Sequence, residues 1–428
     1  MAVPEVHVRP YWELTFDADG DPDPARRDRL LREVRERGVR DLVVFAHGWN
    51  NDRSIATRLY DRFFAPFPAL APGAHLGYVG VLWPSMRFTD EPIPDFDPSA
   101  APAATAPRAT LDKGTRQALH EVFAGQDAVV DRLAGLLDER PDRRGVFDEF
   151  GGLVAQLAGT PAVAPDADAD AESDDADERH AAPAMFRKDT RGVCLEFAEA
   201  LEEAAQGVTS FRWPGGVAKV WQGAHELLRQ ATYFAMKKRA GKVGKEGLGP
   251  ALGRIAHDAP DVRVHLVGHS FGARLVSFAL AGLPAQARNV KSVTLLQGAF
   301  SHYAFAPQGT LRGQQARIDG PLVSCYSHFD TALSVMYPLA SRLAGEDRDI
   351  AGLGMRWGAM GFDGIQSVTG AVRRSLAEVL RTGVPASGCV SVDSAQVVRH
   401  GPPPSGAHSD ICHEELARVV LGAGRVPH

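Results

Sequence analysis

The chain has 428 residues, of which 44% are hydrophobic and 23% charged, a composition typical of globular proteins. Its formal net charge of −6 argues against a nucleic-acid-binding protein and against a polybasic protein of membrane surfaces. The amino-terminal segment has no basic stretch followed by an apolar one, so we expect no signal peptide. No apolar run approaches the roughly 20 residues that a membrane-spanning helix requires, so we expect no transmembrane segment.

The cysteines indicate the compartment in which the chain works. They are Cys194, Cys325, Cys389 and Cys412, which are widely separated and show no CxxC spacing. Isolated cysteines are more typical of a reducing compartment than of a disulfide framework. We therefore expect a cytoplasmic protein.

Short apolar runs rich in Val and Leu recur along the chain, separated by segments with helical spacing. An alternating stretch at 6–16 predicts one or two edge strands. Apolar runs of strand length follow at 41–49, 75–83, 262–269, 290–300, 320–328 and 389–398. Such runs, alternating with helices, predict an α/β fold with a mostly parallel sheet of about seven or eight strands and helices on both faces.

Helical spacing of apolar residues marks the segments between these strands. A helix is expected at 53–64, between the runs at 41–49 and 75–83. Further helices are expected at 116–138, 146–157, 191–206 and 217–256. Most of these fall in a long interruption of the strand series.

That interruption suggests how the chain is divided. Residues 161–183 are acidic, rich in Ala and Pro and free of aromatic residues, which is typical of a disordered linker. We expect residues 1–88 to form the first part of a core, 89–215 a helical insertion or cap, and 216–428 the second part of the core.

One short motif carries the strongest chemical signal. In VRVHLVGHSFGARLVSFALAG, at 262–282, Ser270 and the neighbouring His269 stand between Gly268 and Gly272. A nucleophilic serine at the carboxyl edge of a sheet sits on a sharp strand-to-helix turn, where small residues two positions before and after it permit close packing. The alternative is a merely structural turn. The strand-like run before the motif and the helical pattern after it favour the nucleophile.

A second motif, FAHGWNND at 45–52, ends an earlier predicted strand. Acyl transfer creates an oxyanion, which is best stabilised by backbone N–H groups already aimed at it. Gly48 would allow a tight turn, and the amides of Trp49 and Phe271 would be the two donors. In the alternative interpretation HGW only ends the strand, with His47 packed against the loop.

Together these motifs resemble those of the α/β-hydrolase superfamily of serine hydrolases. HGWN after one strand, LWPS (82–85) after the next and GHSFG after a third are similar to a group of poorly characterised bacterial α/β hydrolases. The resemblance covers 41–85 and 258–421 and leaves out the insertion. It implies an acid after the second strand beyond the serine and a histidine after the last strand.

Candidates for both partners follow in that order. Asp330 comes after the run at 320–328 and is our choice of acid, although it could instead cap the next helix, and Asp363 is the fallback. Three histidines follow the last predicted strand. His408 lies in a loop just before a helix and is our choice of base, because His400 is too close to the strand and His413 is expected on the helix.

These residues predict a serine hydrolase in which Ser270 attacks an acyl carbonyl, His408 takes its proton and Asp330 orients His408. No zinc-protease HExxH pattern and no phosphate-binding loop is present, so no metal or organic cofactor is implied. An esterase or lipase that takes a small-molecule substrate is the favoured activity. A thioesterase, a peptidase and a non-catalytic binding or interaction protein on the same scaffold stay open.

The kind of acyl group is suggested only by apolar residues. Phe63, Phe64 and Phe67 follow the HGW motif closely in sequence, and the expected insertion has apolar helix faces. Both features predict an apolar acyl group, although apolar helix faces more often belong to a core.

Overall fold

The structure is a computed structural model. It describes residues 4–89, 110–159, 184–187, 189–204, 214–337, 339–340, 358–401 and 405–427. The acidic linker expected at 161–183 lies outside these residues. Within the described part of the chain, no helix combines the length and the apolar character needed to cross a membrane.

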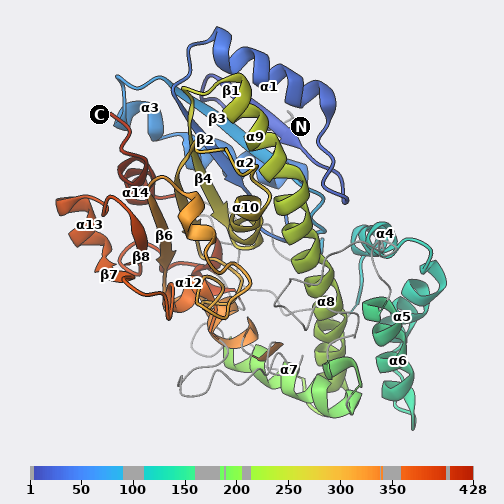
Figure 1. Cartoon of the computed structure of the whole chain (residues 1–428). Coiled ribbons are helices and arrows are strands. Elements are labelled where there is room, and N and C mark those ends of the chain that lie inside the picture. The colour runs from blue at the N-terminus through green and yellow to red at the C-terminus, as the bar shows by residue number, and fades with distance from the viewer. Residues whose placement is uncertain are drawn as a thin grey trace.

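A single eight-stranded sheet organises the fold, with strand order β1-β3-β2-β4-β5-β6-β8-β7 (Figure 1). Its strands are β1 (Tyr11–Thr15), β2 (Asp41–Ala46), β3 (Leu76–Leu82), β4 (Arg263–His269), β5 (Val290–Leu296), β6 (Pro321–Tyr326), β7 (Val372–Ser375) and β8 (Gly388–Asp393). Every pairing between these strands is parallel. The expected α/β class is therefore confirmed, and the carboxyl ends of all the strands share one edge.

Helices cover both faces of the sheet because its inner strands are apolar on both sides. In β2, Val44 and Ala46 pack into one hydrophobic cluster, whereas Val43 and Phe45 pack into the other. The first cluster includes side chains of α1 (Pro24–Glu36), α10 (Phe271–Ala281) and α9 (Gly249–Asp258). The second includes side chains of α2 (Arg53–Phe64), α3 (Phe67–Leu70), α13 (Leu376–Thr382) and α14 (Glu414–Gly424).

The edge strand β7 is not predicted by the sequence pattern. Its four residues, VRRS, include two adjacent arginines, and their burial alternates between half-buried and exposed. A short polar edge strand has only one neighbour and little apolar surface to bury. It therefore lacks the apolar run by which the other strands are recognised.

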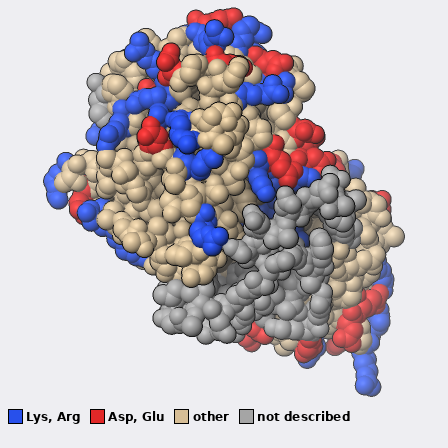
Figure 2. Space-filling model, viewed as in Figure 1, with Lys and Arg blue, Asp and Glu red and all other residues tan. Residues whose placement is uncertain are grey.

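Positive and negative charges are mixed on the face of the molecule that Figure 2 shows. Figure 2 shows basic and acidic side chains interspersed over the sheet layer on this face. Surface ion pairs also occur within single elements, as between Arg29 and Glu33 of α1, where the nitrogen–oxygen distance is 2.7 Å.

A group of helices lies to one side of the sheet (Figure 1). It consists of α4 (Lys113–Val122), α5 (Asp127–Glu139), α6 (Val146–Gly159) and α7 (Thr190–Ala204). The pattern expected as one helix at 116–138 is in fact two, because the chain turns between them through Gly125, which has a left-handed φ of 81°.

The long helix α8 (Val217–Lys242) connects this group with the sheet layer. Near its start, the ring of Trp221 packs on those of Phe147 and Phe150 of α6, with centroids 4.8 and 5.7 Å away. Nearer its end α8 packs on α10, and it continues through the π-helical η3 (Val243–Leu248) into α9. The second half of α8 thus lies beside the helix that follows Ser270.

Candidate active site

Ser270 lies on a strained turn between β4 and α10. Its φ of 55° and ψ of −119° are unusual for a residue with a side chain. The turn is possible only with glycines around it. A Cβ on Gly272 would lie 2.0 Å from the carbonyl oxygen of Ala46, and one on Gly268 would lie 2.4 Å from the carbonyl oxygen of Gly272. Strand, turn and helix therefore present Ser270 at the carboxyl edge of the sheet.

The structure brings the three residues expected to cooperate into one hydrogen-bonded chain. His408 Nε2 lies 2.9 Å from Ser270 Oγ, and His408 Nδ1 lies 2.8 Å from Asp330 Oδ2. Asp330 follows β6, and His408 lies in η6 (Gly406–Ser409), which follows β8. These segments are far apart in sequence and meet because the ends of β4, β6 and β8 share an edge.

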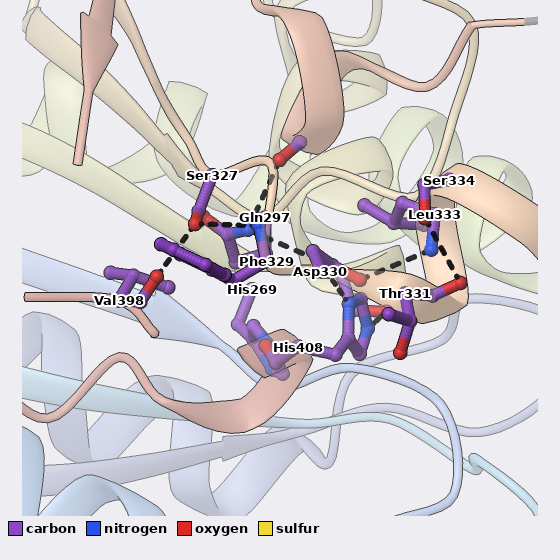
Figure 3. Close-up of polar contacts among 12 residues, drawn as sticks. His269, Gln297, Ser327, Phe329, Asp330, Thr331, Leu333, Ser334, Val398 and His408 are labelled. Carbon is purple, nitrogen blue, oxygen red and sulfur yellow. Dashed lines mark hydrogen bonds and ion pairs between the residues drawn. The ribbon is translucent and has the colours of Figure 1, made fainter. Parts of the chain in front are cut away.

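The surroundings of Asp330 define the tautomer of His408. Asp330 is fully buried and its carboxylate can only accept hydrogen bonds, so Nδ1 of His408 donates to it. In the neutral imidazole, Nε2 is then left as an acceptor facing the Ser270 hydroxyl. Figure 3 shows two further donors to Asp330, which are the side-chain amide of Gln297 at 3.1 Å and the backbone N–H of Leu333 at 3.1 Å.

The other candidates have different partners. The fallback acid Asp363, in α12 (Met360–Asp363), accepts a hydrogen bond from Nδ1 of His302 at 2.8 Å. His413 precedes α14 rather than lying within it, and its Nε2 is 2.8 Å from Asp410 Oδ1. The backbone amide of His400 also donates to Asp410. Neither Asp363 nor these two histidines belongs to the chain that reaches Ser270.

The HGW turn packs directly against Ser270. A Cβ on Gly48 would lie 2.6 Å from the Cβ of Ser270, so a glycine is required there. The carbonyl oxygen of Gly48 accepts hydrogen bonds from His47 Nδ1 at 2.9 Å and from Asn51 Nδ2 at 3.1 Å. In a trans peptide the N–H points away from the C=O. These two side chains therefore also fix the direction of the Trp49 N–H.

Both amides expected to bind an oxyanion lack an acceptor in the described part of the chain. Among the described residues, the backbone N–H of Trp49 donates no hydrogen bond. Phe271 is the first residue of α10, so its N–H has no acceptor within the helix. The sequence interpretation missed Asn51, although it stands within the quoted motif and an Asn beside a tight turn often binds nearby carbonyl groups.

Two more histidines surround the turn, and both are held neutral. Burial lowers the pKa of His47 to about 4 and that of His269 to about 3. Nε2 of His269 donates to the backbone carbonyl of His408 at 2.8 Å. His269 therefore supports the backbone of His408 and does not compete with it as a base.

Aromatic rings from the HGW turn and from α8 pack against Phe271, the residue after Ser270. The ring of Tyr233 is 4.9 Å from that of Phe271 and 5.8 Å from that of Trp49, and the guanidinium of Arg229 lies 4.5 Å above the Trp49 ring. By contrast, Phe63, Phe64 and Phe67 pack in the hydrophobic core on the opposite face of the sheet, with Phe45 and Tyr78. They give no support to an acyl pocket.

No family model, curated protein or solved structure matches the chain. The described residues also contain no cluster of three or more His, Cys, Asp or Glu side chains placed to hold a metal ion. A functional assignment therefore depends on the geometry around Ser270.

Proposed function

We propose that the chain is a serine hydrolase of the α/β-hydrolase type that cleaves a carboxylic ester. The observation that carries this proposal is the hydrogen-bonded chain Ser270–His408–Asp330, with Ser270 on a left-handed turn. A serine alone is a poor nucleophile and needs a base within hydrogen-bonding reach that a third group orients. In this chain His408 lies within reach of Ser270, and Asp330 is the group that would orient it.

The reaction would proceed through an acyl-enzyme. Ser270 Oγ attacks the acyl carbonyl carbon while Nε2 of His408 takes the hydroxyl proton, and Asp330 stabilises the imidazolium. The tetrahedral intermediate collapses as His408 gives the proton to the leaving alcohol. Water then attacks the acyl carbon, His408 takes a proton from it, and Ser270 leaves as the free hydroxyl with the acid as product.

The amides of Trp49 and Phe271 would bind the negative oxygen of each tetrahedral intermediate. One such donor typically contributes about 3 kcal/mol to transition-state stabilisation. His47 and Asn51 hold the Gly48 carbonyl and thereby keep the Trp49 amide aimed before substrate arrives. Preorganised donors need no rearrangement during the reaction, which is the source of their effect.

The ring cluster supports an apolar or flat acyl group beside the serine. The half-buried rings of Trp49 and Tyr233 offer aromatic surface close to the Trp49 amide, while the ring of Phe271, which both contact, is buried. On this proposal, helices α4–α7 and the first half of α8 form a cap that contributes to substrate selection.

A panel of acyl substrates tests the proposal. We expect p-nitrophenyl esters to give an initial burst of one equivalent of p-nitrophenol, followed by a slower steady state, because p-nitrophenolate leaves fast and deacylation then limits turnover. Matched thioesters and peptides with the same acyl group should react more slowly. Faster cleavage of thioesters or peptides would reassign the substrate class, and absence of any turnover by the folded protein would favour a non-catalytic binding protein.

A further inference from the structure

A glutamine that the sequence motifs do not single out lies against the acid of the triad. Gln297 directly follows β5, the strand next to β4, and is fully buried. The residue before it and the second residue after it bind the backbone of Ser270. The Ser270 N–H donates to the carbonyl of Leu296 at 3.1 Å, and the Ala299 N–H donates to the carbonyl of Ser270 at 3.3 Å. Gln297 thus belongs to the segment that holds the nucleophile turn.

The backbone of Gln297 is strained. Its φ of 47° places a residue with a side chain in the left-handed region, which costs on the order of 1 kcal/mol. Such a conformation persists where its surroundings hold it, and these positions concentrate at functional sites. The next residue is Gly298, and a glycine at position 297 would have adopted this φ without strain. A glutamine in this position therefore needs a reason that its side chain supplies.

That side chain uses both hydrogens of its amide nitrogen. Nε2 donates to Asp330 Oδ2 at 3.1 Å and to the carbonyl oxygen of Gly361 at 3.0 Å (Figure 3). Both partners can only accept, so the opposite orientation of the amide would place its oxygen against two acceptors. The nitrogen must therefore face Asp330.

We propose that Gln297 is a positioning residue that holds Asp330 in the orientation in which it binds His408. The oxygen Oδ2 accepts from both Gln297 and His408, whereas Oδ1 accepts from the Leu333 N–H. The Gly361 carbonyl orients the Gln297 amide, and this amide orients Oδ2 of Asp330. The same oxygen in turn orients the imidazole of His408. Without Gln297, the donors left to the Asp330 carboxylate among the described residues would be the Leu333 N–H and the His408 ring that the carboxylate has to orient. This inference assumes that the triad is catalytic, as proposed above.

The side chain needed for this role is an amide at this length. Methionine has a similar length but cannot donate a hydrogen bond, so Gln297→Met removes the donor and keeps most of the volume. We expect kcat for ester hydrolysis to fall about 10- to 100-fold, with KM nearly unchanged, because the substrate does not contact Gln297. Gln315→Met, at a half-buried glutamine of η4 (Gln314–Arg317), is the matched control and should leave both constants unchanged.

A second variant gives a readout that loss of packing would not change. In Gln297→Glu the new carboxyl can replace the donor to Asp330 only while it is protonated. Burial and the adjacent carboxylate of Asp330 both raise its pKa above the ordinary value of about 4.3. As the pH rises through that raised pKa, the group ionises and repels Asp330. We therefore expect the pH–rate profile of Gln297→Glu to gain a descending limb that the wild type and Gln297→Met lack.

The two variants separate this inference from the proposed function. If wild-type protein shows no Ser270-dependent hydrolysis, the proposed function itself fails. If the wild type is active but folded Gln297→Met keeps kcat within about twofold, Gln297 does not position Asp330. If Gln297→Met does not fold, Gln297→Glu still tests whether Gln297 positions Asp330, since the activity of this one folded protein is followed across pH. A Glu profile with the wild-type shape would overturn the inference.

Discussion

The described part of the chain contains two arrangements of serine, histidine and aspartate, one near the amino ends and one near the carboxyl ends of the strands of the same sheet. Near the amino ends of the strands, His265 of β4 lies 2.9 Å from Asp41 Oδ1 of β2 and 3.0 Å from Ser292 Oγ of β5. These distances match those among Ser270, His408 and Asp330. A candidate active site and a structural network can therefore have the same residue types and the same hydrogen-bond lengths.

The backbone is the first difference between the two arrangements. Ser292 lies within β5, paired with His265 across the ladder, so its amide belongs to the sheet. Ser270 lies on a left-handed turn at the start of a helix. Only the second position leaves N–H groups next to the hydroxyl that could bind an oxyanion.

Burial and charge are the second difference. Ser292 is 0% exposed and His265 is 1% exposed, so no substrate could reach them. Asp41 also forms an ion pair with Arg263 at 2.5 Å, whereas the described partners of Asp330, apart from His408, are uncharged amides. Burial lowers the pKa of His265, although its contact with Asp41 acts in the opposite direction. This network connects three strands, and its role is structural.

The largest expected effect comes from exchanging each serine for alanine. Ser270→Ala should lower kcat by about 10⁴-fold or more, because it removes the nucleophile. Ser292→Ala should leave kcat unchanged and lower the free energy of unfolding by about 1 kcal/mol, for one lost buried hydrogen bond. Steady-state kinetics and urea unfolding of both variants measure the contrast. Equal effects of the two substitutions on kcat would contradict the distinction between the Ser270 and Ser292 networks.

The next effect separates the buried aspartates Asp330 and Asp41 from each other and from the half-buried Asp363. Asp330→Asn should lower kcat about 10⁴-fold, because an amide favours the wrong tautomer of His408. Asp41→Asn should instead destabilise the fold by roughly 2 kcal/mol without changing kcat, because it removes the buried carboxylate that the half-exposed Arg263 and the buried His265 contact. Asp363→Asn tests the fallback acid and should retain activity. Loss of kcat in Asp363→Asn with full activity in Asp330→Asn would reverse the assignment.

A smaller kinetic effect is expected at the HGW turn. Gly48→Ala places a Cβ 2.6 Å from that of Ser270, which must displace either the serine or the Trp49 amide. Loss of one oxyanion donor lowers kcat about 10²- to 10³-fold. Gly38→Ala is a useful control for backbone strain alone, since Gly38 has a φ of 64° and no described atom lies within 4 Å of the position that a Cβ would take there. Its cost should appear in stability and not in kcat.

The smallest effect concerns stability in mild acid. The folded-state pKa of His47, about 4, and of His269, about 3, lie below the unfolded value of about 6.5. The unfolded chain therefore binds more protons below pH 6.5, and stability is complete above that pH and falls as the pH drops. Each histidine contributes a slope of about 1.4 kcal/mol per pH unit.

The variant His269→Gln isolates one of these contributions. Its amide nitrogen can still donate to the His408 carbonyl, but the side chain does not titrate. Between pH 6 and 5, the slope of unfolding free energy against pH should be about 1.4 kcal/mol per unit smaller than in the wild type. An unchanged slope in urea melts would show that His269 is not held neutral.

The two networks also show which parts of a site can be predicted from the sequence. Gly268, Ser270 and Gly272 are neighbours in the chain, so their turn could be predicted from local pattern. Asp330 and His408 could be chosen because the resemblance to α/β hydrolases implies an acid and then a histidine after particular strands, and parallel strands bring these segments to the same end of the sheet. The α/β class followed from the apolar runs.

The contacts that depend on strand order could not be predicted in this way. Gln297 meets Asp330 only because β5 lies beside β6, and Asp41 meets His265 only because β2 lies beside β4. No motif connects these residues along the chain. Phe63 was misleading for the same reason, since closeness in sequence to the HGW turn does not indicate which face of the sheet a helix covers.

Covalent labelling tests the central claim most directly. A fluorophosphonate reacts with a serine that is activated as a nucleophile, and mass spectrometry of the peptides then locates the adduct. We predict one equivalent on Ser270 in the wild type, strongly reduced labelling in His408→Gln and none in Ser270→Ala. An adduct that persists in folded Ser270→Ala, or no adduct on the folded wild type, would contradict the assignment of Ser270 as the nucleophile.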